Sequence, residues 1–253
     1  MKVEILLDSL NPYTDIRLTT FYLVYPQNCH QHILTHRMFS RNAMSLRAIS
    51  TERVIDFKLS YPTWTLEKKG MWGDLADQAT SEAANQLLEE MYAANLYYAK
   101  AFTELGIHHQ NINDYLRPYT DIHVILSATD LDNFFKLRLA KGTKPDTRIL
   151  AEKMINALEE STPIYKYVHI PLAGTFDNDG LSEYDINLIC AARLARYSYM
   201  QWTDDITKDI TLARKLIADQ HASPFEHIAY ASEEQKYFAN FNSWVQWRKI
   251  LAL

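Results

Sequence analysis

Glycine is scarce in this sequence, with only six in 253 residues, and no two glycines are separated by a single residue. Nucleotide-binding loops of the GxGxxG and GxxxxGK[ST] types need closely spaced glycines, because the backbone itself must approach the phosphates. A GxSxG nucleophile elbow is also missing. The sequence therefore excludes these phosphate loops and this hydrolase motif, and a bound nucleotide would have to be held by side chains.

Cysteine is almost absent as well. Cys29 and Cys190 lie far apart and outside any CxxC pattern, which is typical of free thiols in a reducing compartment. We see no secretory signal and no apolar run near the roughly 20 residues of a membrane span, so we expect a cytoplasmic protein. The net charge of −5 argues against nucleic acid or an anionic membrane as partners.

Acidic residues are missing from positions 16–51, although the whole chain has 31 acids and 26 bases. This stretch contains THRMFSRNAMSLR, residues 35–47, with Arg37, Arg41 and Arg47. Guanidinium groups and hydroxyls in one acid-free patch suit a phosphate. The alternative is a solvated basic face, or a patch that pairs with acids from elsewhere in the chain.

Histidines in the same stretch do not predict a metal site. His32 and His36 have helical i,i+4 spacing, but the glutamate of an HExxH motif is missing, so polar surface or substrate contact is favoured. If the start of the motif is helical, His36, Ser40, Ala43 and Arg47 share one face. The pair His108–His109 follows a helix end and is typical of a solvated loop.

Hydrophobic periodicity and chain breakers predict an α+β protein without regular βαβ alternation. Gly106 is expected to cap a long helix, Ser182 to begin another, and Gly70, Trp72 and Gly73 to form a loop. The expected strands or extended stretches are 16–26, 166–173 and 226–239, with loop and extended chain at 39–62. The expected helices are 28–38, 74–105, 121–139, 146–160, 182–199, 205–220 and 243–253.

Three further segments carry candidate chemistry. Residues 136–148 (KLRLAKGTKPDTR) contain five bases and one acid, and the alternative to a binding role is an exposed loop. Residues 191–199 (AARLARYSY) place Arg193 and Arg196 on an apolar helix, where pairing with a buried carboxylate is expected. Residues 221–227 (HASPFEH) combine two imidazoles, a hydroxyl and a carboxylate, although a helix cap and strand entry is the simpler interpretation.

These segments together resemble the flavin-dependent thymidylate synthases, the ThyX family. His36-Arg37, followed after seven residues by Ser45 and then Arg47, resembles the Arg-His-Arg motif of that family. HASPFEH and AARLARYSY resemble two other family segments. LDNFFKLR, residues 131–138, with Asp146-Thr147-Arg148, resembles the segment that ends in Glu-x-Arg.

The order of these segments differs from that of the family. Here the Ala-Ala-Arg and Pro-Phe-Glu-His segments come last, which predicts one circularly permuted domain over 1–253 with the family's N-terminal half at about 168–230. The terminal VQWRK, 245–249, resembles the Gln-Trp-x-Arg that normally precedes the motif. Whether the stretch before His36 is a replacement or a duplication stays open.

The resemblance implies a ThyX-like α+β fold, with a small, mostly antiparallel sheet and several long helices. It implies methylation of dUMP to dTMP, with methylenetetrahydrofolate as carbon donor, NADPH as reductant and a bound FAD as hydride relay. It also implies a homotetramer with shared active sites and no cysteine nucleophile. dUMP and folate are thus the expected small-molecule partners.

The resemblance also implies roles for individual residues. Arg148 would be catalytic, stabilising negative charge on the pyrimidine. The implied FAD contacts are His36, Arg37, Arg138, His221 and Ser223. The implied dUMP contacts are Ser45, Arg47, His123 and Gln246.

Three positions depart from the family pattern. Thr35 replaces an arginine, Ala43 a glutamate, and His123 falls where many members have an arginine. These departures leave open a pyrimidine nucleotide hydroxymethylase, which would use the same folate carbon, and a non-catalytic nucleotide-binding protein on the same fold. They also leave open dUMP against dCMP as substrate.

Overall fold

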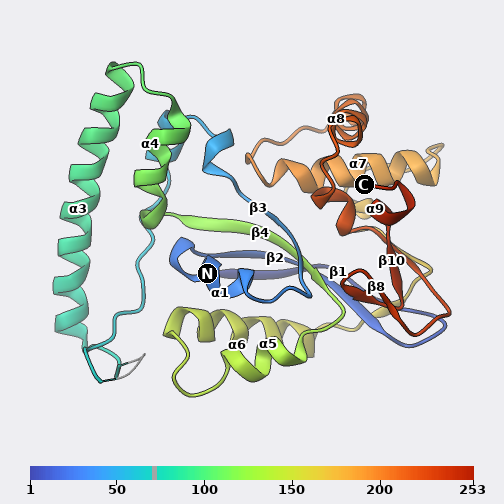
Figure 1. The fold of residues 1–253 in the computed structure, drawn as a ribbon, viewed down its shortest axis with the longest axis horizontal. Coiled ribbons are helices and arrows are strands. Elements are labelled where there is room, and N and C mark those ends of the chain that lie inside the picture. Colours follow the sequence, from blue (N-terminus) through green and yellow to red (C-terminus); the bar gives the residue numbers. More distant parts are fainter. Residues whose placement is uncertain (70–72) are drawn as a thin grey trace.

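The computed structural model describes residues 1–69 and 73–253 and has a five-stranded sheet at its centre (Figure 1). Neighbouring strands of this sheet are antiparallel except for the last pair, which is parallel. The strands, in their order across the sheet, are β3 (Ser40–Ala43), β4 (Asp121–Ala128), β2 (Arg17–Pro26), β1 (Lys2–Leu10) and β5 (Ile164–Tyr165). This arrangement confirms the expected α+β class with a mostly antiparallel sheet.

The central strands β2 and β4 are rich in β-branched and aromatic residues. The strand predicted at 16–26 is confirmed, but the helix predicted at 121–139 is wrong, because 121–128 form β4 and only Asp132–Arg138 are helical, as α5. The run DIHVILSA is largely buried, and periodicity cannot distinguish such an apolar run from a buried helix.

One face of the sheet carries the main hydrophobic core. Helices α5 and α6 (Pro145–Glu160) pack below this sheet in the view of Figure 1, and α1 (His30–Leu34) adds to the same core. The sheet contributes Phe21, Leu23, Tyr25, Val124 and Leu126, and the helices contribute Ile33, Phe134, Leu150 and Met154. The helix predicted at 146–160 is confirmed.

Helix α3 (Gln78–Glu104) stands at one edge of the molecule beside α4 (His109–Leu116) (Figure 1). The Asp77 carboxylate caps its start by accepting from the Thr80 amide at 2.8 Å. Gly106 follows its end with a φ of 75°, which confirms the predicted glycine cap. The predicted solvated loop at His108–His109 is correct for His108, which is exposed and caps α4 by accepting from the Gln110 amide, but wrong for His109, which begins α4.

The chain after residue 167 forms a second layer against the other face of the sheet. It contains α7 (Glu183–Arg196), α8 (Ile206–Ala218) and α9 (Trp247–Ile250), and the Ser182 cap is confirmed by its bond from the Asp185 amide. A small sheet has the order β10 (Trp244–Gln246), β7 (Ala229–Ala231), β6 (Val168–His169), and β8 (Tyr237–Phe238) pairs with β9 (Phe241–Asn242). The strands expected at 166–173 and 226–239 are thus much shorter than predicted.

Short helices complete the chain. Helix α2 (Thr51–Ile55) lies within the stretch expected to be loop and extended chain. The 3₁₀ helices are η1 (Gln27–Cys29), η2 (Leu46–Ala48), η3 (Arg117–Tyr119), η4 (Ala173–Thr175) and η5 (Ser223–Glu226). Of the predicted loop, Gly70 and Trp72 lie outside the described residues. Within the described ranges, no helix is long and apolar enough to span a membrane.

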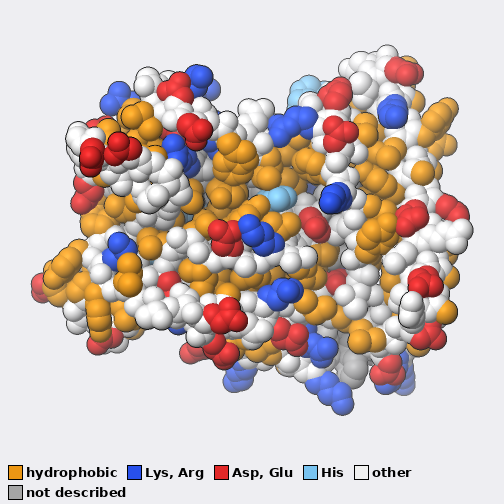
Figure 2. Space-filling view, turned by 180° about the vertical axis from the view of Figure 1, so that it is seen from behind, with side chains coloured by type: hydrophobic (Ala, Val, Ile, Leu, Met, Phe, Trp, Pro, Cys, Tyr) orange, Lys and Arg blue, Asp and Glu red, His pale blue; other side chains and the backbone are white. Residues whose placement is uncertain are grey.

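Charges of both signs are interspersed on the face seen in Figure 2, with hydrophobic side chains exposed between them. This face has no large field of one sign to attract a polyanion. Binding of an anion on this face must therefore depend on local groups.

Candidate functional site

The motif of residues 35–47 does not form one helix. Helix α1 ends at Leu34, and Ser40–Ala43 form strand β3, which pairs with β4 from Ser127 to Val124. The single helical face expected for His36, Ser40, Ala43 and Arg47 is therefore wrong, because strand pairing fixes the middle of the motif. His36 and Arg37 precede β3, whereas Ser45 and Arg47 follow it.

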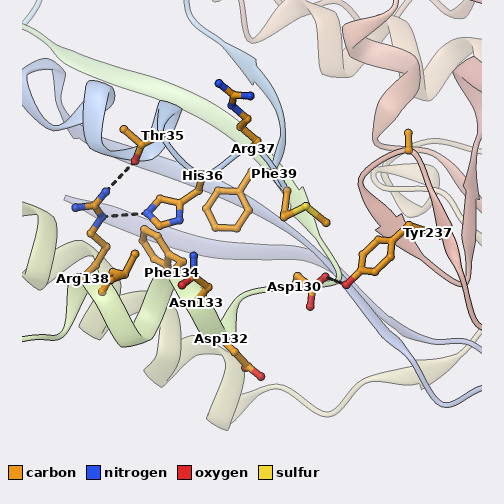
Figure 3. A pocket seen from close by; sticks show the side chains of 13 residues that line it. Thr35, His36, Arg37, Phe39, Asp130, Asp132, Asn133, Phe134, Arg138 and Tyr237 are labelled. Atoms are coloured by element: carbon orange, nitrogen blue, oxygen red, sulfur yellow. Dashed lines mark hydrogen bonds between the residues drawn. The ribbon is translucent and has the colours of Figure 1, made fainter.

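A pocket of about 910 Å³ opens beside the first part of the motif (Figure 3). Three separate parts of the chain form it: the turn after α1, helix α5 with the loop before it, and the hairpin β8–β9. Its lining residues are Thr35, His36, Arg37, Met38, Phe39, Asp130, Asp132, Asn133, Phe134, Leu137, Arg138, Tyr237 and Ala239.

Arg138 fixes the state of His36 in this pocket (Figure 3). The Arg138 Nε–H donates to His36 Nε2 at 3.0 Å, so in the neutral ring the proton lies on Nδ1. Burial, and then the nearby Arg138 and Arg41 charges, lower the pKa of His36. His36 therefore presents a neutral Nδ1–H donor, and the positive charge at this end belongs to Arg37 and Arg138.

Thr35 has a structural reason to differ from the family's arginine. Its hydroxyl accepts from Arg138 Nη2 at 2.8 Å, and the same nitrogen donates to the His32 carbonyl at 3.2 Å. An arginine at position 35 would place a second guanidinium group beside that of Arg138, and the two positive charges would repel each other. The exposed Arg37 guanidinium points away from His36 and makes no hydrogen bond or ion pair with any residue the structure describes (Figure 3).

The two motif segments, residues 35–47 and 221–227, meet within one chain. The Ser223 hydroxyl donates to Asn42 Oδ1 at 3.2 Å, and the Asn42 amide donates to the Leu194 carbonyl at 2.6 Å. This contact brings the two segments together despite their separation in sequence. The His221 side chain, in contrast, is exposed at the start of its segment.

Gln246 joins the same two segments. Its buried amide donates to Ser40 Oγ at 2.7 Å and to the Glu226 carbonyl at 3.1 Å. Its Oε1 accepts from Arg248 Nε at 3.0 Å. The structure therefore gives Gln246 a role in holding the C-terminal layer on β3, and its predicted contact with substrate stays a prediction.

The second group of predicted contacts lies beyond the other end of β3. His123 Nδ1 shares a hydrogen bond of 2.6 Å with the Tyr22 hydroxyl, and burial lowers the pKa of His123. The Ser45 amide donates to the Ser198 carbonyl at 2.7 Å, and the side chain of Arg47 is exposed. Of these residues, only Arg47 offers a cation to an anionic ligand.

Arg148 lies apart from the His36 pocket. It lies in the first turn of α6 and forms an ion pair of 3.4 Å with Glu152. It also lines a hollow of about 220 Å³ together with Thr143 and Pro145. One chain therefore does not bring the predicted catalytic arginine to the predicted flavin contacts.

The two arginines of α7 have the structural role expected from the sequence. Arg193 Nε and Arg196 Nε donate to the two oxygens of the buried Asp209 carboxylate at 3.0 and 2.8 Å. Asp209 lies on α8, so this ion pair joins the two helices.

Sequence reasoning did not find several pocket residues. Phe39 and Phe134 flank motif residues but were not singled out, although their aromatic character was a usable signal. Asp130 and Tyr237 carried no signal, because only the folded hairpin brings them together. Among the described residues, no cluster of three or more His, Cys, Asp or Glu could hold a metal ion.

Comparison with known proteins identifies the family. The family model described as "Thymidylate synthase complementing protein" matches residues 17–164, which are 148 of 253 residues. No curated protein matches the chain.

Two solved structures are similar to the chain. The UMP/dUMP methylase PolB from Streptomyces cacaoi, bound with 5-Br UMP, has a TM-score of 0.51 and 15% identity, covering 63% of this chain and 88% of that chain. Thymidylate Synthase X from Helicobacter pylori, with FAD and dUMP, has a TM-score of 0.41 and 15% identity, covering 56% and 67%. The first likeness shows a shared fold, and the family match, over more than half of the chain, shows that this protein belongs to the thymidylate synthase complementing proteins.

Proposed function

We propose that the protein is a flavin-dependent thymidylate synthase, which methylates dUMP to dTMP with methylenetetrahydrofolate as carbon donor and NADPH as reductant. The observation that carries this proposal is the family match over 17–164, since this range contains His36, Arg37 and Arg138 of one pocket. The resemblance of HASPFEH to a family segment, and its contact with β3, add support.

The pocket fits a flavin nucleotide. Its volume of about 910 Å³ is near the upper end of the usual range for ligand sites. Arg37 and Arg138 offer guanidinium donors to phosphate, and His36 offers a neutral N–H donor. When bound, FAD would supply the hydride that reduces the transferred carbon. The Ser223 hydroxyl donates to the Asn42 side chain of β3. Ser223 and His221 complete this proposed set of flavin contacts.

We place the nucleotide substrate beyond the other end of β3, near Ser45, Arg47 and His123. Because His123 is neutral and bonded to Tyr22, Arg47 would carry the phosphate charge. PolB is described as acting on UMP and dUMP, so the ribonucleotide belongs among the substrates to be tested.

We propose further that the protein is a homotetramer whose active sites are shared between subunits. Arg148 lies outside the His36 pocket, so a second subunit would have to bring it to the pyrimidine. Helix α3 presents an apolar stripe that includes Leu87, Tyr98 and Leu105, which are 62%, 60% and 76% exposed. Such a stripe is typical of a helix that packs against another subunit.

The domain organisation belongs to the same proposal. Residues 1–253 would form one domain in permuted order, with residues 168–230 equivalent to the family's N-terminal half. The bonds from Ser223 to Asn42 and from Gln246 to Ser40 support it, because they join the last part of the chain to the motif.

The mass of the nucleotide product tests the function. The protein is incubated with FAD, NADPH, methylenetetrahydrofolate and one of dUMP, UMP or dCMP. We expect a methylated product from dUMP together with NADPH oxidation. A hydroxymethylated product formed without net NADPH oxidation would instead identify a hydroxymethylase, and no product from any nucleotide would refute the catalytic proposal.

A further inference from the structure

The pocket has two ends of opposite charge. Arg138 lies beside His36 on one side of the pocket and Asp130 lies beside Tyr237 on the other, whereas Arg37 and Asp132 extend away from this line in opposite directions (Figure 3). A carboxylate repels a phosphate, so the phosphates of a flavin nucleotide belong with the arginines. The acidic end therefore suits an uncharged part of the ligand that carries hydrogen-bond donors.

In this structure the donor at the acidic end is a tyrosine of the protein itself. The Tyr237 hydroxyl donates to Asp130 Oδ2, and among the described residues it is the only hydrogen-bond partner of that carboxylate. This bond raises the pKa of the Tyr237 phenol. The Tyr237 side chain is 52% exposed, so packing does not hold it in place.

The rest of the hairpin is held independently of this bond. The Asn240 amide donates to the Met38 carbonyl at 3.1 Å and to Ser40 Oγ at 2.9 Å. The backbone N–H of Asn242 donates to Thr129 Oγ1 at 3.0 Å. The Tyr237 hydroxyl can therefore leave Asp130 while β9 stays attached to the pocket.

We propose that Asp130 is a ligand-binding residue of the pocket, which accepts a hydrogen bond from a sugar-chain hydroxyl of the flavin nucleotide, and that the Tyr237 hydroxyl occupies this carboxylate until the ligand displaces it. The inference rests on the proposed binding of FAD. An ionised carboxylate only accepts, so its partner must be a donor, and the sugar hydroxyls are the uncharged donors nearest to the phosphates. Phe39 and Phe134 supply the apolar part of the wall.

Displacement of Tyr237 by the ligand means that substitutions of Tyr237 and of Asp130 should change the affinity for FAD in opposite directions. Tyr237→Phe removes a competitor, so FAD should bind about three- to tenfold more tightly. Asp130→Ala removes the acceptor, so FAD should bind about tenfold more weakly. In the Asp130→Ala background, Tyr237→Phe should have no further effect, because the competition no longer exists. Flavin fluorescence titration measures all four dissociation constants.

Two comparisons isolate the effect. Tyr165 donates to Asp15 at 2.9 Å in an equally exposed bond that is not part of the pocket, so Tyr165→Phe should leave FAD affinity unchanged. Asp132→Ala removes the same charge from the pocket, but the Asp132 carboxylate points away from Tyr237 (Figure 3). Equal weakening by Asp132→Ala and Asp130→Ala would show that the effect is not specific to the carboxylate that Tyr237 occupies, and would overturn the proposal.

Other outcomes also decide. Weaker binding in both Tyr237→Phe and Asp130→Ala would mean that the bond only holds the pocket wall, and unchanged affinity in both would remove Asp130 from the site; each overturns the inference. FAD binding to the wild-type protein in those cases would leave the proposed function standing. No binding of FAD to the wild type would overturn the proposed function and the inference together.

Discussion

At the scale of single residues, the Asp209 carboxylate is a buried charge that depends on its ion-pair partners. It is fully buried and binds Arg193 and Arg196 at once. Asp209→Ala leaves two largely buried guanidinium groups without their partner, which should cost about 3–5 kcal/mol in the free energy of unfolding. Urea denaturation followed by circular dichroism measures this loss.

The control for that substitution is Asp204→Asn, at an exposed position just before the same helix. It should change the free energy of unfolding by less than about 0.5 kcal/mol. A loss of similar size in both variants would contradict the assigned role of Asp209.

Residue chemistry could be predicted from the sequence only in part. An arginine on an apolar helix indicates a carboxylate partner, but the identity of Asp209 depends on how α7 and α8 pack. In the same way, the motif predicts His36 as a ligand contact, whereas its neutral state follows from its burial and then from Arg138, about a hundred positions later. Charge states of this kind depend on tertiary contacts, which no local pattern contains.

At the scale of elements, a buried chain of polar side chains joins the C-terminal layer to the sheet. His227 Nδ1 and the Ser127 hydroxyl are 2.8 Å apart, Ser127 and Thr20 are 2.6 Å apart, and Thr20 is 2.8 Å from His169 Nε2. His169 Nδ1 ends the chain at Ser9 Oγ, also at 2.8 Å. Burial lowers the pKa of both histidines to about 3, so the folded protein keeps them neutral.

This chain predicts a loss of stability in acid. The folded pKa values lie below the ordinary value of 6.5, so the stabilising effect of each neutral histidine is complete above pH 6.5 and is lost as the pH falls toward 3. Between pH 7 and pH 5 each should lower the free energy of unfolding by about 2 kcal/mol. In His227→Gln the slope of that free energy against pH should fall by about one proton, measured by urea denaturation at several pH values. An unchanged slope would contradict this account.

The apolar stripe of α3 predicts how subunits associate. Leu87→Lys with Tyr98→Lys places two charges on this stripe and should convert the assembly to smaller species, because burying them would be costly. Lys100→Glu, at an exposed position outside the stripe, should leave the assembly intact. Sedimentation velocity measures the masses. A monomeric wild type, or equal masses for all three proteins, would contradict the proposed assembly.

Elements with clear end signals could be predicted from the sequence, and buried strands could not. Asp77, Ser182 and Gly106 mark helix ends through local bonds and a positive φ, so α3 and α7 were found. Strand β4 is buried on both faces along most of its length, so its sequence resembles that of a buried helix. The strands after residue 167 are only two or three residues long, which is too short for a periodic signal.

At the scale of the whole molecule, the last third of the chain contacts strand β3 and the pocket, which both begin in the family-matched range. Residues 17–164 match the family model, and the C-terminal layer then adds Ser223, Gln246 and Tyr237 around β3 and the pocket. The meeting of these segments could be predicted because each carries a recognisable motif. The separation of Arg148 from the pocket could not be predicted, because it depends on how α6 packs in the folded chain.

The catalytic assignment of Arg148 gives a test at this scale. Arg148→Ala should keep FAD binding, because Arg148 lies outside the His36 pocket, and should lose most nucleotide product, by about 10²–10³ in rate. Arg148→Lys should restore only part of the rate, since a point charge does not reproduce a planar guanidinium. Product formation measured beside flavin retention separates the two effects, and near-normal turnover in Arg148→Ala would exclude Arg148 from the mechanism.

The central claim is that the pocket of His36, Arg37 and Arg138 holds the flavin, and the stoichiometry and affinity of FAD binding test it most directly. The account predicts one FAD per chain for the wild type and at least about tenfold weaker binding for Arg138→Ala, which loses a guanidinium donor and the partner of His36. Lys153→Ala, on α6 and outside the pocket, should bind FAD like the wild type. An Arg138→Ala protein that binds FAD as tightly as the wild type, or a wild type that binds none, would contradict the claim.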